Sequence, residues 1–146
     1  MEREIRKTVV VDATPDVVFR ALTDERELVR WMPREAKMDA KVGGEYEFKY
    51  YWPARKLEAT AKGKILELAP GKRLSYSFSS VRGGSTPSLA DSVVTWVLDE
   101  LPDESTRVTV VHSGLTQEMV GESDLGWGHY VNQLAEHCAE VRKRRG

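Results

Sequence analysis

Residues 43–52 read Gly-Gly-Glu-Tyr-Glu-Phe-Lys-Tyr-Tyr-Trp, and this stretch shows what kind of sheet the chain forms. After the glycine pair, which is typical of a tight turn, aromatic side chains recur at every second position. Successive side chains of a β-strand point to opposite faces of the sheet. The stretch therefore predicts a strand with one aromatic face, made up of Tyr46, Phe48, Tyr50 and Trp52.

The same two-residue period runs through the middle of the chain, from about Lys37 to His112. Apolar residues alternate with polar ones in four further segments, which are 57–65, 74–79, 94–98 and 108–112. Turns of hairpin length are predicted at Pro70-Gly71 and at 102–105, and a polar loop at 82–87. Consecutive short strands with short connections predict an antiparallel meander.

Before the meander, the sequence predicts one strand and two short helices. Residues 5–11 are rich in β-branched side chains and predict the strand. Thr14 is suited to the N-cap of a first helix and Pro15 to its first residue. A second short helix is predicted to begin near Asp24, with a glutamate in capping-box spacing, and to end before Pro33.

After the meander, the sequence from Ser123 to about Arg144 returns to helical spacing and predicts one long helix. Its apolar stripe consists of Trp127, Val131, Leu134, Cys138 and Val141. An antiparallel sheet with one apolar face needs a cover, and only this helix is long enough to provide it. We therefore predict an α+β fold in which a curved antiparallel sheet of about six to seven strands wraps around the long C-terminal helix.

Composition narrows the class of protein without indicating its chemistry. The chain has 146 residues, a formal net charge of −1 and one cysteine. This length predicts a single domain, 1–146. The charge provides no general attraction to nucleic acid or acidic lipid, and one cysteine excludes an internal disulfide framework. Since no signal or membrane segment is visible, we expect a cytoplasmic protein that binds neither nucleic acid nor membrane.

Six segments, in this order, resemble a known family. They are Ala13–Phe19 with Ala21–Asp24, Trp31–Met32, Val42–Tyr46, Gly63–Leu74, Thr106–Gly114, and Gly126–Trp127 with Leu134. Together they resemble the START-like helix-grip (SRPBCC) superfamily, and more narrowly the homologues of the heat-shock protein 90 ATPase activator, of the C-terminal-domain type. The resemblance spans nearly the whole chain and implies the helix-grip fold. The superfamily includes carriers of apolar ligands, cyclases and chaperone activators.

The aromatic side chains that face the predicted interior are the candidate ligand-binding residues. Large rings fill cores, but tyrosine and tryptophan tips also need polar partners, as in small-molecule sites. Ala59, Ala61 and Gly63 on the neighbouring strand leave room for a cavity. The candidate set is Trp31, Phe48, Tyr50, Trp52, Tyr76, Phe78, Trp96, His112, Trp127 and Tyr130. The alternative is that these residues only pack the core.

The remaining reactive residue types predict no catalytic centre. His112 has an inward phase, so it is either a hydrogen-bonded structural residue or a group that orients a ligand. His129 and His137 lie eight residues apart on the predicted helix, too far for neighbouring metal ligands. Cys138 lies within the apolar stripe and is expected to be buried, and Glu67 is expected to form a salt bridge or turn contact. We expect no catalytic residue, no metal ligand and no cofactor.

Three functions follow from these features. The first is non-enzymatic binding of a small apolar or aromatic molecule in a cavity between the sheet and the C-terminal helix. The second is a chaperone-related or other protein-interaction module that uses the outer sheet face or the loops. The third is a cyclase- or hydrolase-like enzyme on the same fold. The expected partner is accordingly a small molecule, or else a chaperone or another protein, with the chain a monomer or homodimer.

Overall fold

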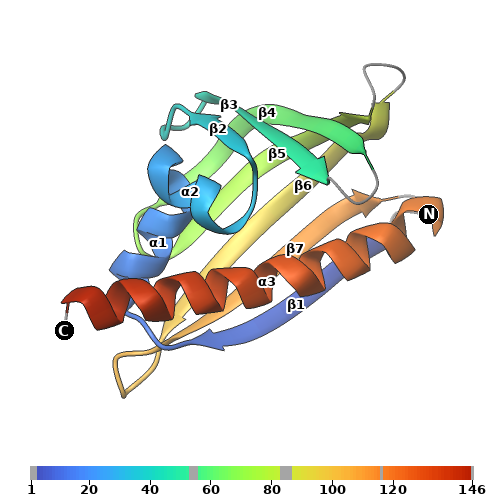
Figure 1. Ribbon diagram of the computed structural model, residues 1–146. Helices are drawn as coiled ribbons and strands as arrows, with labels where there is room; N and C mark the ends of the chain where they lie inside the picture. The colour runs from blue at the N-terminus through green and yellow to red at the C-terminus, as the bar shows by residue number, and fades with distance from the viewer. Residues whose placement is uncertain (1–2, 53–55, 83–86, 116, 146) are drawn as a thin grey trace.

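The computed structural model describes residues 3–52, 56–82, 87–115 and 117–145 (Figure 1). The described residues form seven strands and three helices, and all of them occur in the predicted order except β2, for which the sequence predicted no segment. They are β1 (Arg3–Val11), α1 (Pro15–Thr23), α2 (Glu25–Trp31), β2 (Glu35–Met38), β3 (Glu45–Trp52), β4 (Leu57–Ala69), β5 (Arg73–Arg82), β6 (Pro87–Glu100), β7 (Thr106–Leu115) and α3 (Gln117–Arg145). Among the described residues, no helix combines the length and apolar character that crossing a lipid bilayer requires.

The sheet is fully antiparallel, with the strand order β1-β7-β6-β5-β4-β3-β2. It curves around α3, while α1 and α2 close one end of the interior (Figure 1). The backbone of α3 lies close to β1, whereas β3, β4 and β5 stand further from it. The helix-grip prediction is confirmed. Large aromatic side chains must fill the wider space between α3 and the strands β3, β4 and β5.

Two element boundaries differ from the sequence-based prediction. The helix α3 begins at Gln117, six residues before the expected start at Ser123. Once a helix is nucleated, each added residue gains a hydrogen bond, so a helix extends beyond its apolar stripe. The edge strand β2 has only four residues, which is too short for an alternating pattern to delimit it.

The starts of the two short helices follow the sequence only in part. The carboxylate of Asp24 accepts a hydrogen bond from the backbone N–H of Arg26 at 2.9 Å, as expected of an N-cap. The side chain of Thr14 forms no cap hydrogen bond. Glu27, expected in a capping box, instead contacts His137 Nε2 through Oε1 at 2.8 Å. This glutamate therefore joins α2 to α3.

The helix α3 buries four of the five residues of its predicted stripe, while Val141, near its end, is only half-buried. Trp127, Val131, Leu134 and Cys138 belong to the contiguous core, and Leu134 and Cys138 are fully buried. Burial raises the pKa of the Cys138 thiol to about 12, so this cysteine is an inert core residue as expected. Glu67 forms the expected salt bridge, with Arg73 Nε 3.2 Å from its Oε2.

Strand β4 passes very close to the backbone of β5 at Gly63. The backbone N–H of Lys64 donates to the Ser77 hydroxyl at 2.9 Å, and the Tyr46 hydroxyl donates to the Ser77 carbonyl at 2.7 Å. A Cβ atom on Gly63 would overlap that carbonyl oxygen. The space beside Gly63 is thus occupied by the backbone of β5, and the expectation that Gly63 leaves room for a cavity is wrong.

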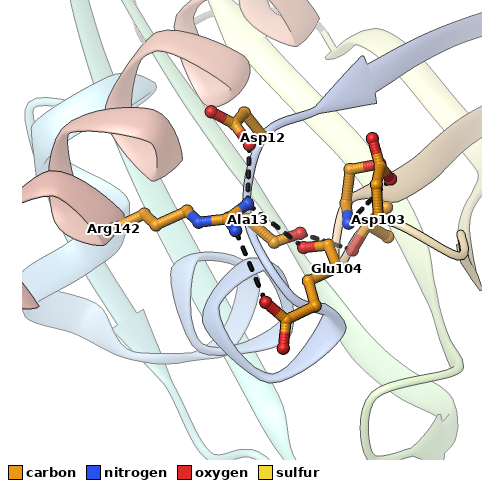
Figure 2. Close-up of polar contacts among 7 residues, drawn as sticks. Asp12, Ala13, Asp103, Glu104 and Arg142 are labelled. Carbon is orange, nitrogen blue, oxygen red and sulfur yellow. Dashed lines mark hydrogen bonds and ion pairs between the residues drawn. The ribbon is translucent and has the colours of Figure 1, made fainter. Parts of the chain in front are cut away.

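Arg142 links the C-terminal end of α3 to the loop after β1 and to the loop between β6 and β7 (Figure 2). Its Nη1 lies 2.6 Å from Asp12 Oδ1 and 3.3 Å from the carbonyl oxygen of Glu104, whose carboxylate lies 3.7 Å from Nη2. Beside this contact, the buried hydroxyl of Thr106 donates to the carbonyl of Ala13 at 2.7 Å. Residues far apart in the sequence therefore meet where α3 ends.

We expect Arg142→Ala to lower the free energy of unfolding by about 0.5–1 kcal/mol, because solvent-exposed ion pairs contribute no more than that. Urea unfolding should show this loss at low salt and little of it at about 1 M salt. Lys41→Ala, which removes the more exposed 3.5 Å pair with Asp39, is the control and should change little. A loss that salt leaves unchanged would mean that Arg142 acts by packing.

Candidate functional site

The interior between the sheet and α3 is a continuous cluster of aromatic rings. Trp96 on β6 lies at its centre, with ring centroids 6.0 Å from Trp31 on α2 and 5.5 Å from Trp127 on α3. On the β3 side, Tyr46 lies 4.7 Å from Tyr76. Such edge-to-face pairs add to the stability gained from burial. The rings thus span the distance that separates α3 from β3–β5.

A chain of buried hydrogen bonds links the helix to three strands. The indole N–H of Trp127 donates to Nδ1 of His112 at 2.9 Å, and Nε2 of His112 lies 2.9 Å from the Ser92 hydroxyl. The Ser92 hydroxyl donates to the carbonyl oxygen of Phe78 at 2.7 Å. The chain runs from α3 through β7 and β6 to β5, and we call it the Trp127–His112–Ser92 relay.

The relay determines the tautomer of His112. An indole N–H can only donate, so Nδ1 of the imidazole must accept and the proton of the neutral ring is on Nε2. Nε2 then donates to the Ser92 hydroxyl. A second proton on Nδ1 would face the N–H of Trp127, and burial lowers the pKa of His112 to about 4. His112 is therefore neutral, with both nitrogens engaged.

This geometry predicts how stability depends on pH. The folded pKa of His112 lies near 4 and the unfolded one near about 6.5, so the unfolded state binds more protons between these values. Stability should therefore fall as pH falls through that window, by up to about 1.4 kcal/mol per pH unit from this residue.

The matched variant for this prediction is His112→Gln. Its amide can accept from Trp127 and donate to Ser92, but it does not titrate. In urea unfolding at about pH 7 and about pH 5, the wild type should lose stability relative to the variant as the pH is lowered. If the wild type and the variant lost the same free energy of unfolding between these two pH values, the assigned protonation state of His112 would be contradicted.

The other polar tips of the interior are also satisfied. The indole N–H of Trp96 donates to the Tyr76 hydroxyl at 3.1 Å, and that of Trp31 donates to the carbonyl of Ala21 at 2.8 Å. Burial raises the pKa of Tyr46 and of Tyr76 above the ordinary value, so both phenols stay neutral. Among the described residues, no buried side-chain nitrogen or oxygen lacks a hydrogen-bond partner.

One edge of the aromatic interior is incompletely buried. Tyr50 on β3 and Tyr130 on α3 face each other with ring centroids 6.0 Å apart, and both are half-buried. Burial, followed by the neighbouring phenols of Tyr76 and Tyr130, raises the pKa of Tyr50. This tyrosine pair therefore connects β3 to α3 at the edge of the aromatic interior.

The structure brings the described members of the candidate set into one interior. Trp31, Phe48, Tyr76, Phe78, Trp96, His112 and Trp127 are buried, and Tyr50 and Tyr130 form the half-buried edge. The side chain of Trp52 lies outside the described residues. Ser92 was missing from the set although it connects the relay. Ser92 lies two residues before Val94 on β6, so the two-residue alternation of this strand already indicated that it faces inward.

A concave feature lies on the outer face of the sheet, opposite the aromatic interior. It is an open groove of about 1130 Å³. Its lining comes from α2 and β2–β5 and carries charges of both signs: Glu25, Lys37, Met38, Asp39, Glu45, Tyr46, Glu47, Lys62, Gly63, Lys64, Ser77 and Ser79. A mixed-charge groove suits a polar macromolecular surface better than an apolar small molecule.

Comparison with known proteins identifies relatives of this architecture. Residues 12–139 match the model of a family described as Activator of Hsp90 ATPase homolog 1-like protein. Among solved structures, protein CV1439 from Chromobacterium violaceum is similar at 30% identity, with a TM-score of 0.75 over 92% of this chain and 96% of that one. CalU16 from Micromonospora echinospora is similar at 27% identity, with a TM-score of 0.72 over 98% and 80%.

The Aha1 dimer from Colwellia psychrerythraea shares the fold at 19% identity, with a TM-score of 0.74 over 92% of this chain and 94% of that one. No curated protein sequence gives a significant match.

Proposed function

Because this chain belongs to the family of Activator of Hsp90 ATPase homolog 1-like proteins, whose fold commonly binds ligands or interacts with proteins, we propose that it binds one small apolar or aromatic molecule. The site lies between the sheet and α3, at the edge formed by Tyr50 and Tyr130. No chemical step is part of this function. The fully buried histidine of the described interior, His112, is neutral with both nitrogens engaged.

The observation that carries the proposal is the half-buried tyrosine pair. Tyr50 and Tyr130 approach from the sheet and the helix, beside the fully engaged interior that contains Trp127 and Tyr76. Aromatic walls with a few polar tips are typical of small-molecule sites. A flat ring entering this edge would stack on rings that are already partly dehydrated, and it would cover their remaining exposed surface.

A small residue beside the pair supports the same position. Ala59 on β4 lies directly opposite Tyr50 in the register of β3 and β4. It is buried, yet it stands outside the contiguous core to which its neighbour Ala61 belongs. An alanine at this position leaves more space next to Tyr50 than a larger apolar residue would.

The test uses 1-N-phenylnaphthylamine, an uncharged aromatic probe whose fluorescence rises in apolar surroundings. We expect saturable binding of one probe per chain, with quenching of tryptophan emission because Trp127 lies about one helical turn before Tyr130 on α3. Ala59→Leu should weaken binding at least about tenfold by filling the space. The matched control is Thr60→Leu, whose side chain points to the opposite sheet face and should leave binding unchanged.

Absence of saturable binding would contradict the proposal. An equal loss of probe affinity in Ala59→Leu and Thr60→Leu would also contradict it, because the site would then not lie on the inner face of the sheet. Native mass spectrometry of protein purified from its own host adds an independent readout. A retained small molecule that Ala59→Leu loses would identify the natural ligand.

A second candidate function is interaction with a heat-shock protein 90-type chaperone through the groove on the outer sheet face. The observation in its favour is the mixed-charge lining, in which Lys62 and Lys64 of β4 lie directly opposite Glu47 and Glu45 of β3. Titration of isotope-labelled protein with the chaperone should then shift amide resonances of β4 and β5. The double variant Lys62→Glu/Lys64→Glu should abolish those shifts, and unshifted spectra would reject this candidate.

A further inference from the structure

We propose that the first part of α3, residues 117–125, is a gate that swings about Gly126 and Gly128 and thereby admits the ligand to the interior. The inference rests on the proposed function and adds how its site is reached. The gate lies beside β1 and β7, at the end of the interior opposite to α1 and α2 (Figure 1).

Two glycines interrupt α3 where packing does not require them. Gly126 and Gly128 flank Trp127, and a Cβ atom built on either glycine meets no atom within 4 Å. Glycine is less favourable than alanine in a helix, because its backbone loses more conformational freedom. Both glycines therefore weaken the helix at one place without a steric reason, which is the property of a hinge.

The part of α3 behind the glycines is firmly held. Val131, Leu134 and Cys138 are buried in the contiguous core. Polar contacts add to this burial, from His137 to Glu27 on α2 and from Arg142 to the loop after β1. This part of the helix therefore stays in place when the gate moves.

The described side chains ahead of the glycines are held by less. Asp124 Oδ1 lies 2.9 Å from Lys7 Nζ, and both side chains are partly exposed, so this ion pair contributes little. Val120 is partly buried against the core, whereas Leu125 is 77% exposed. Position 123, four residues before Trp127, is a serine, so the apolar stripe does not continue there.

Trp127, between the two glycines, connects the gate to the proposed site. Its ring lies 5.5 Å from that of Trp96, and its N–H donates to His112. Tyr130, about one helical turn further along, forms the half-buried edge with Tyr50. Because Trp96 and Trp127 are buried, a molecule as large as naphthalene reaches these rings only when part of their cover moves. Glycine on both sides lets Trp127 move with the gate.

Stabilising the closed helix should slow the gate without changing the site. Gly126→Ala/Gly128→Ala favours the helical form about fivefold per residue and about 30-fold in total. If the helix is closed both before and after binding, every association and dissociation passes through the open form. Both rates then fall by the same factor, and the equilibrium affinity stays the same. Lys7→Ala removes the ion pair and should raise both rates up to about fivefold.

The first measurement is hydrogen exchange of the protein without ligand. Once detached, a nine-residue segment is too short to remain helical, so its amides exchange together. We expect the amides of residues 121–125 to exchange about 30-fold more slowly in Gly126→Ala/Gly128→Ala, with those of residues 134–141 unchanged. If the helix only frayed from Gln117, the glycine substitutions would leave this exchange unchanged and the gate would be overturned.

The second measurement is stopped-flow binding of 1-N-phenylnaphthylamine. We expect Gly126→Ala/Gly128→Ala to slow association and dissociation about 30-fold each, with the equilibrium affinity within about twofold. The matched control is Asn132→Ala, which raises the helix propensity of α3 at an exposed position behind the glycines. It should leave both rates unchanged.

The outcomes separate the two proposals. If the probe does not saturate, the ligand-binding function fails, whereas hydrogen exchange still decides whether residues 117–125 open about the glycines. If the probe saturates and the glycine substitutions leave both rates unchanged, ligand binding stands and the gate is overturned. A changed affinity with an unchanged association rate would also overturn it, because the glycines would then shape the site rather than the route to it.

Discussion

Alanine in place of Gly63 should lower the free energy of unfolding by at least about 3 kcal/mol, although it adds a single methyl group. The new Cβ would overlap the carbonyl oxygen of Ser77 and lie 2.7 Å from its hydroxyl oxygen. Neither atom can move away without loss, because the carbonyl accepts from Tyr46 and the hydroxyl accepts from Lys64. The strands β4 and β5 would have to separate at this point.

The matched control is the same exchange on the helix. A Cβ at Gly126 of α3 meets no atom within 4 Å. Gly126→Ala should therefore raise stability by about 0.5–1 kcal/mol, since alanine favours the helix over glycine. Urea unfolding followed by tryptophan fluorescence measures both variants. If Gly63→Ala proved as benign as Gly126→Ala, the close approach of β5 to Gly63 would be refuted.

Truncation of Leu134 should be the second large effect, with a loss of about 2–5 kcal/mol for Leu134→Ala. Leu134 is fully buried on the face of α3 that packs against the aromatic interior. Removing its side chain leaves a cavity that rigid rings close only in part, because edge-to-face rings such as those of Trp96 and Trp127 cannot collapse into it.

Glu136, two residues further along the same helix, is exposed and provides the control. Glu136→Ala should change the free energy of unfolding by less than about 0.5 kcal/mol. Equal losses for the two variants in urea would show that α3 presents a different face to the sheet.

The amino-acid sequence by itself determined the order of the elements other than β2, and the inward direction of the described aromatic side chains of the candidate set. The reason is that alternation and helical spacing are local properties, set by the backbone geometry of each segment. Phe48 and Trp96 could be assigned to the interior in this way, and so could Leu134 and Cys138. Each needs only its own strand or helix to define its direction.

Only the tertiary structure decided what the inward side chains do to one another. The partners in the Trp127–His112–Ser92 relay come from α3, β7 and β6, so no local pattern reveals that His112 is held neutral between them. Gly63 shows the same limit, because its space is taken by the backbone of β5, which the sequence of β4 does not encode. Hydrogen-bond partners and free volume depend on how separate segments approach, and that approach is a property of the packed whole.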